Sequence, residues 1–156
     1  MPMKALKELL NLHGFAKVST YIQSGNVVLE ANSDPSQRIS ELIQREFGFR
    51  PEIFAFDQQN YQKIVEANPY KTHEGKFVHL FFCKDRPQLD QAMIESLIAE
   101  GEQYFMMGKI FYLHAPNGIG RSKLVQKIDA CLGAVNTSRN LNTVNKLAGL
   151  VANMAS

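Results

Sequence analysis

Apolar residues recur along the chain at helical spacing in some segments and at strand spacing in others. In chain order, this pattern predicts a helix at 6–13, strands at 18–22 and 27–29, a helix at 34–47, a strand at 51–56, a helix at 57–68, a strand at 77–83, a helix at 89–98, strands at 104–107 and 110–113, and helices at 124–132 and 144–151. Glycines at 14, 48 and 133 supply natural helix ends. The nearly continuous apolar run at 77–83 is typical of a central strand that is buried on both faces.

The order of these elements predicts an α+β protein with largely antiparallel sheets. Residues 1–70 and 71–156 read as two similar halves, each close to a ferredoxin-like β-α-β-β-α-β unit, so the expectation is a tandem, duplicated fold. The first half lacks its first strand, and the second half ends in an extra helix instead of a strand. The missing strand is central in that topology. Another segment or a second subunit would then fill the gap, and self-association is one way to do so.

Composition excludes several classes of protein. The chain has 156 residues, of which 45% are hydrophobic and 21% charged, as in a globular protein. It shows neither a membrane-length apolar run nor a signal peptide, so the cytoplasm is the expected location. Cys83 and Cys131 stand alone in apolar patterns, which favours two buried thiols over a disulfide.

Charge is distributed unevenly along the chain. From Lys109 to the end there are six basic residues and one acid, Asp129, which makes +5. Because the whole chain carries +2, residues 1–108 carry −3. A basic last third is compatible with an anionic partner and equally with ordinary surface charge.

Two polar blocks lie in this basic third. In the first, a glycine-broken turn leads into a helix, and its candidate anion ligands are Gly118, Gly120, Arg121, Ser122 and Lys123. Helix N-termini attract anions through unbonded N–H groups. The spacing fits neither a P-loop nor a dinucleotide-binding turn. The structural alternative is that Ser122 caps its helix and the glycines supply positive φ angles.

The second block, 137–143, is expected to open the last helix. Its candidate ligands are Arg139, Asn140, Asn142 and Thr143. Either asparagine could instead simply cap the helix, and Arg139 could pair with a carboxylate or a backbone carbonyl. If the two blocks meet in space, Arg121, Lys123, Arg139 and Asn142 would form one phosphate-sized pocket.

The turn of the first predicted hairpin offers secondary candidates: Gln23, Ser24 and Asn26. Glycine and asparagine tolerate the left-handed region and serine bonds locally, so these residues also suit a plain turn. In the functional alternative, Gln23 and Asn26 read a ligand on the rim of the sheet.

Three segments resemble a known family, the bacterial domain of unknown function 1697: 21–28, 118–124 and 137–147. Members of that family normally begin with a strand and a glycine-rich segment ahead of the first helix, and this sequence departs from that pattern. The resemblance implies a tandem ferredoxin-like fold. It implies no established activity, substrate or catalytic residue.

The hypothesis that fits these features best is a non-catalytic binding module for a phosphate-bearing ligand, either a nucleotide or a nucleic acid. The alternatives are an enzyme acting on a small anionic substrate and a protein-interaction or assembly module. No cofactor and no metal are expected, because the four histidines show no ligand spacing for zinc. No nucleophile motif supports a hydrolase.

Overall fold

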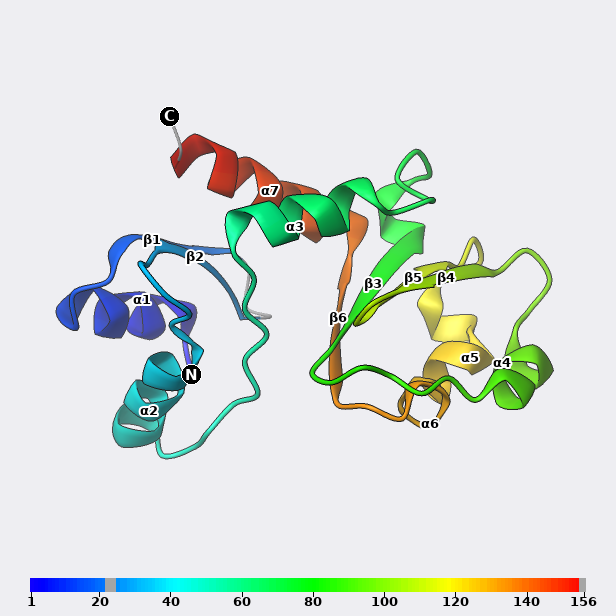
Figure 1. The fold of residues 1–156 in the computed structure, drawn as a ribbon, viewed down its shortest axis with the longest axis horizontal. Helices are drawn as coiled ribbons and strands as arrows, with labels where there is room; N and C mark the ends of the chain where they lie inside the picture. Colours follow the sequence, from blue (N-terminus) through cyan, green and yellow to red (C-terminus); the bar gives the residue numbers. More distant parts are fainter. Residues whose placement is uncertain (22–24, 155–156) are drawn as a thin grey trace. The chain divides into compact units, whose positions relative to one another are not determined.

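In the computed structural model, which describes residues 1–21 and 25–154, the chain is an α+β protein with two antiparallel sheets (Figure 1). It divides into two units. The first unit comprises Met1–Tyr61 and Lys146–Ser156, and the second comprises Gln62–Asn145. The boundaries fall within α3 (Gln58–Glu66) and within α7 (Leu141–Met154).

The first unit packs two helices, α1 (Met3–Leu12) and α2 (Ser36–Phe47), with a two-stranded sheet. Strand β1 (Ala16–Tyr21) pairs with β2 (Asn26–Glu30), as the predicted hairpin requires. The apolar stripes of both helices converge on a core with Val18: Met3, Leu6, Leu9, Leu10, Leu42 and Ile43. Gly48 ends α2 in the left-handed conformation, as expected.

The strand predicted at 51–56 does not form, and this segment belongs to neither sheet. A strand persists only where a neighbouring strand bonds its backbone. In the described part of the first unit, the sheet consists of β1 and β2 alone, and neither pairs with residues 51–56. Its apolar residues match a strand pattern, but no ladder joins this segment to either sheet among the described residues.

The second unit is built on a four-stranded sheet in the order β4-β5-β3-β6. Its strands are β3 (Val78–Cys83), β4 (Gln103–Met107), β5 (Ile110–His114) and β6 (Asn136–Asn140). The apolar run predicted to be central does form β3, which is buried along its whole length between β5 and β6.

One face of this sheet carries the core of the second unit. Helices α4 (Gln91–Leu97), α5 (Lys123–Gln126) and α6 (Ile128–Leu132) pack there. The main buried residues of this core are Phe81, Cys83, Ile94, Phe111, Leu113, Leu124, Cys131 and Leu132. Cys83 and Cys131 are both free and buried, which confirms the expectation of two buried thiols.

Two boundaries in the last third differ from the prediction. Residues Asn136–Asn140 form β6 and pair with β3, so the second unit does end in a strand before its extra helix. The sequence of this strand, Asn-Thr-Ser-Arg-Asn, is polar and therefore lacks an apolar strand pattern. A polar sequence is tolerated because β6 is an edge strand, where side chains can contact solvent. The helix predicted at 124–132 is divided at Lys127, whose ψ of 21° separates α5 from α6.

None of the helices in the described part of the chain combines the length and the apolar character of a membrane span.

Candidate functional site

Three segments meet at one end of the four-stranded sheet. The short 3-10 helix η1 (Gly75–Phe77) leads into β3, the turn with η2 (Ile119–Arg121) follows β5, and α7 follows β6. Ala115 N–H donates to the carbonyl oxygen of Phe77 at 2.8 Å, which ties the turn to η1. The first polar block, after β5, and the last residues of the second block, from Asn140 on, therefore lie at this end, on the two sides of β3.

The first block is held by its own backbone and cap contacts. Gly118 has a φ of 88°, and its N–H donates to the Ala115 carbonyl at 2.9 Å. Ser122 is 2% exposed and accepts from Val125 N–H at 3.2 Å, so it caps α5. These contacts give both residues structural roles. The neighbouring Gly120, Arg121 and Lys123 are exposed.

The second block splits between the two faces of the sheet, because side chains alternate along a strand. Arg139 pairs with Leu80, while Asn140 pairs with the next residue of β3, His79. The guanidinium of Arg139 folds back on its own strand, with Nη1 donating to Thr137 Oγ1 at 2.9 Å and to the Ser138 carbonyl at 2.6 Å. Partial burial lowers the pKa of Arg139. Arg139 thus does not share a face with Asn140.

Asn140 and Asn142 form the polar start of α7. The Oδ1 atom of Asn140 accepts from Thr143 N–H at 3.0 Å and so caps the helix. Asn142, the second residue of the helix, is exposed and lies against Gly75 of η1. A Cβ atom on Gly75 would lie 2.7 Å from Cγ of Asn142 and 3.1 Å from its backbone nitrogen, so a larger residue at position 75 would displace the Asn142 side chain.

His79 is the residue at this end of the sheet that sequence reasoning missed. It is 6% exposed, and its Nε2 atom has no hydrogen-bond partner. Burial lowers the pKa of His79, and a hydrogen bond with the backbone of Lys76 partly opposes this shift. His79 pairs with Asn140, and directly paired side chains share a face about 5 Å apart. The ring therefore lies beside the cap of α7.

An aromatic cluster occupies the β5 side of the same sheet end. The ring of His114 stacks on that of His73, with centroids 4.0 Å apart, and Tyr70 lies 6.0 Å from His114. His73 is exposed. Burial and the neighbouring His73 both lower the pKa of His114.

The secondary candidates lie in the first unit. Asn26 is 7% exposed, and its Nδ2 atom donates to the carbonyl of Tyr21 at 3.0 Å, which is a turn contact. Gln23 and Ser24 lie outside the described residues.

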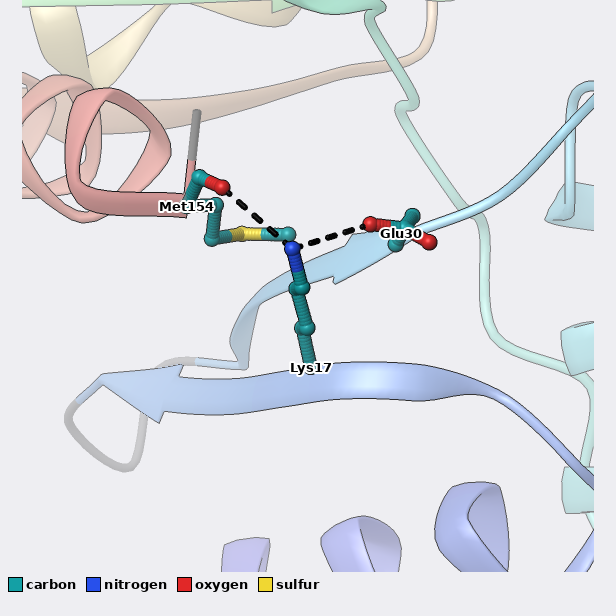
Figure 2. Close-up of polar contacts among 3 residues, drawn as sticks. All are labelled: Lys17, Glu30 and Met154. Atoms are coloured by element: carbon teal, nitrogen blue, oxygen red, sulfur yellow. Dashed lines mark hydrogen bonds and ion pairs between the residues drawn. The ribbon is translucent and has the colours of Figure 1, made fainter. Parts of the chain in front are cut away.

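A hollow of about 350 Å³ also lies in the first unit, where β1 meets the C-terminal end of α7. Lys17, which lines it, bonds Glu30 at 3.3 Å and the carbonyl of Met154 at 3.5 Å (Figure 2). Lys17 also has a φ of 53°, the one positive φ of a non-glycine residue in the described chain. The ammonium group of Lys17 is already bonded to Glu30 and Met154. This hollow is therefore a weaker candidate for anion binding than the start of α7.

Within residues 1–21 and 25–154, no group of three or more His, Cys, Asp or Glu side chains is placed to hold a metal ion. The stacked pair His73 and His114 presents ring faces to each other, with an interplanar angle of 18°, rather than converging lone pairs.

Comparison with known proteins bears on the fold and the family. A solved structure of a conserved bacterial protein from Streptococcus pneumoniae superposes with a TM-score of 0.71 at 19% sequence identity. The match covers 97% of this chain and 89% of that chain, and at this identity it shows a shared fold alone. A comparison with curated proteins gave no match. The family model described as "Protein of unknown function (DUF1697)" matches residues 1–112. The chain therefore belongs to the DUF1697 family, as the resemblance predicts, and the motif at 21–28 lies within the matched residues.

Proposed function

We propose that the protein is a non-catalytic module that binds a phosphate-bearing ligand, a nucleotide or a nucleic acid, at the first turn of α7. The observation that carries the proposal is the unpartnered Nε2 atom of His79 beside the cap of this 14-residue helix. A buried polar atom without a partner is costly, and native proteins retain few of them without a reason. A ligand oxygen would supply the missing partner.

The start of α7 has the chemistry that a phosphate needs. The first N–H groups of a helix lack partners within the helix and carry a partial positive charge. Asn140 satisfies the N–H of Thr143. The N–H groups of Leu141 and Asn142 belong to the same first turn, and the exposed amide of Asn142 stands beside them.

Protonation of His79 would complete such a site. In the neutral ring one nitrogen is an acceptor, and in the charged ring both nitrogens donate. A phosphate near Nε2 favours the charged ring and opposes the effect of burial. Phosphate binding is therefore expected to take up a proton.

Nearby basic residues support the same ligand class. Arg121 and Lys123 are exposed, and neither forms an ion pair with any described residue. They follow β5 at the end of the sheet where α7 follows β6. Unpaired cations around a site raise the local concentration of an anion and speed its association.

The decisive variant is Asn142→Asp. It keeps the shape of the side chain and places a carboxylate in the first turn of α7. A negative charge there stabilises a helix by about 0.3–1 kcal/mol, while it repels a bound phosphate. We expect the midpoint of thermal unfolding to hold or rise, and affinity for ADP or inorganic pyrophosphate to fall at least about tenfold, because the new carboxylate and the phosphate would repel each other at close range.

The matched control is Asn145→Asp, which makes the same change one turn further along α7 at another exposed position. Calorimetric titration of the parent and both variants separates loss of binding from loss of fold. Equal affinity in the parent and in Asn142→Asp would refute the site. If the parent binds neither ligand, the proposed function is refuted and the assembly module remains as the alternative. Light scattering over a range of protein concentrations tests that alternative.

The same titrations address the alternative of an enzyme. After long incubation with the parent, the nucleotide is expected to be recovered unchanged by ion-exchange chromatography. Conversion of the nucleotide would replace the binding module with a catalyst.

A further inference from the structure

Strand β4 forms one edge of the four-stranded sheet, and within the described residues no strand pairs with its outer side. A two-residue turn, 108–109, joins β4 to β5, so Met107 and Ile110 form the closing hydrogen-bonded pair of the hairpin. Hydrogen-bonded pairs alternate with non-bonded ones along an antiparallel ladder. The N–H and C=O groups of Tyr104 and Met106 therefore point away from β5, where another strand can bond them.

This edge lacks the features by which proteins usually prevent strand pairing. Strand β4 contains no charged residue and no proline, and it pairs with β5 in an unbroken register. Tyr104 and Met106 pack against the core under α4, α5 and α6. Phe105 and Met107 point to the opposite face and are 42% and 39% exposed. A strand added at this edge would cover apolar surface in addition to bonding the backbone.

The charges around β4 indicate which strand fits. Glu100 and Glu102 precede the strand, and Lys109 follows it. Lys109 is exposed and forms no ion pair with any described residue. If β4 pairs with another β4 in the antiparallel sense, the acidic start of each strand lies beside the basic turn of the other. A parallel pairing would place glutamates beside glutamates, which is unfavourable.

We propose that the partner of β4 is a second copy of this chain, paired antiparallel about a two-fold axis at Phe105. Tyr104 then exchanges both of its backbone hydrogen bonds with Met106 of the second copy. The Phe105 residues of the two copies form a non-hydrogen-bonded pair, in which Cα atoms are about 4.5 Å apart and side chains approach most closely. Aromatic pairs across strands stabilise a sheet.

This interface is independent of the proposed phosphate site. Strand β4 and strand β6 lie at opposite edges of the sheet, and α7 follows β6. Loss of the dimer would therefore leave the proposed function standing, and loss of phosphate binding would leave the dimer standing.

The first test measures the register of the pairing with single cysteines under a mild oxidant. In Phe105→Cys the two new thiols meet at the axis, within the Cα separation of about 7 Å that a disulfide tolerates. In Met107→Cys, the matched control on the same face, the thiols lie about 14 Å apart, because each step along a strand is about 3.4 Å. We expect Phe105→Cys to form linked dimers at least about tenfold faster, since pairing raises the effective concentration of one thiol near the other. Equal rates in the two variants would overturn the proposal.

The second test measures molar mass by light scattering over a range of protein concentrations. The parent is expected to approach the mass of two chains as concentration rises, and a parent that stays at the mass of one chain would overturn the proposal. Phe105→Lys should remain a monomer, because like charges would meet at the axis. Val135→Lys, at another exposed apolar position of the second unit, should dimerise as the parent does.

A mixture of Phe105→Lys and Phe105→Glu distinguishes charge repulsion from damage to the fold. Each variant alone should be a monomer, whereas the mixture should recover the mass of two chains through opposite charges at the axis. If Phe105→Lys dimerises as well as the parent, or if the mixture stays monomeric, the second copy does not pair at β4.

Discussion

His79 carries a ring nitrogen without a partner in a strand that is otherwise apolar. The sequence does not predict this unbonded nitrogen, because a lone histidine in an apolar run usually belongs to the core and forms its hydrogen bonds there. Only the pairing of β3 with β6 places this ring beside the cap of α7. Asn140, by contrast, was identifiable from its position before an apolar periodic segment.

The pH dependence of stability provides a test at this scale. Burial lowers the pKa of His79 below its ordinary value of 6.5, so the unfolded chain binds the proton more readily than the folded chain. The contribution of His79 to the free energy of unfolding is therefore largest above the pKa of the unfolded state. It is lost as pH falls through the pKa of the folded state. Burial also lowers the pKa of His114, which adds to the same slope.

In His79→Leu, the part of the slope that comes from His79 should disappear. Urea unfolding followed by circular dichroism at several pH values between about 8 and 5 measures this for parent and variant. A parent whose stability does not change over this window would contradict the assigned burial effect. So would a variant that keeps the whole slope.

At the scale of elements, agreement between prediction and structure follows the strength of the apolar signal. The run Val78–Cys83 is long and continuous, and it forms the central strand as predicted. Residues 51–56 carry a similar apolar signal but belong to neither sheet in the described part of the chain, because a local pattern does not encode long-range pairing. β6 shows the converse, since pairing with β3 imposes a strand on a polar sequence. Secondary structure that depends on a neighbour is thus the part that sequence alone predicts least.

A long-range hydrogen bond joins the last turn of α3 to β5 within the second unit. The hydroxyl of Tyr112 donates to the carbonyl oxygen of Ile64 at 2.7 Å, and Tyr112 is fully buried. Ile64 lies in the last turn of α3, where carbonyl groups run out of helical partners. Burial raises the pKa of Tyr112 to about 12, so its proton stays available for this bond at neutral pH.

Tyr112→Phe is expected to leave the Ile64 carbonyl without its partner. The loss should lower the free energy of unfolding by about 1–3 kcal/mol, the cost of a buried unsatisfied group. Tyr104→Phe is the matched control, because the Tyr104 hydroxyl bonds the exposed Gln91 and its removal should cost little. Equal decreases in the free energy of unfolding of the two variants, measured by urea unfolding, would mean that the hydrogen bond to Ile64 stabilises the fold no more than the exposed one does.

For the whole molecule, the main feature is that each unit has a core of its own. Leu10 is fully buried in the first core with Leu6, Leu42 and Ile43, and Phe111 is fully buried in the second. The two clusters share no residue. A destabilising substitution in one core should therefore first increase local unfolding of its own unit.

Leu10→Ala is expected to cost about 2–5 kcal/mol through the cavity that it leaves. Hydrogen exchange measured by mass spectrometry should show faster exchange in α1, β1 and β2, with protection of β3 and β5 nearly unchanged. Uniform loss of protection along the chain would mean instead that the two units unfold as one. Phe111→Ala provides the reciprocal experiment in the second core.

Lys17 illustrates a conflict between two demands on one position. Its φ of 53° lies in the left-handed region, which costs most residues about 1–2 kcal/mol and which glycine and asparagine tolerate best. Its side chain, however, reaches both the carboxylate of Glu30 and the last turn of α7, which requires a long cation. No single amino acid satisfies both demands, since those suited to the backbone lack the amine. Position 17 is therefore locally frustrated, and whichever residue occupies it leaves one requirement unmet.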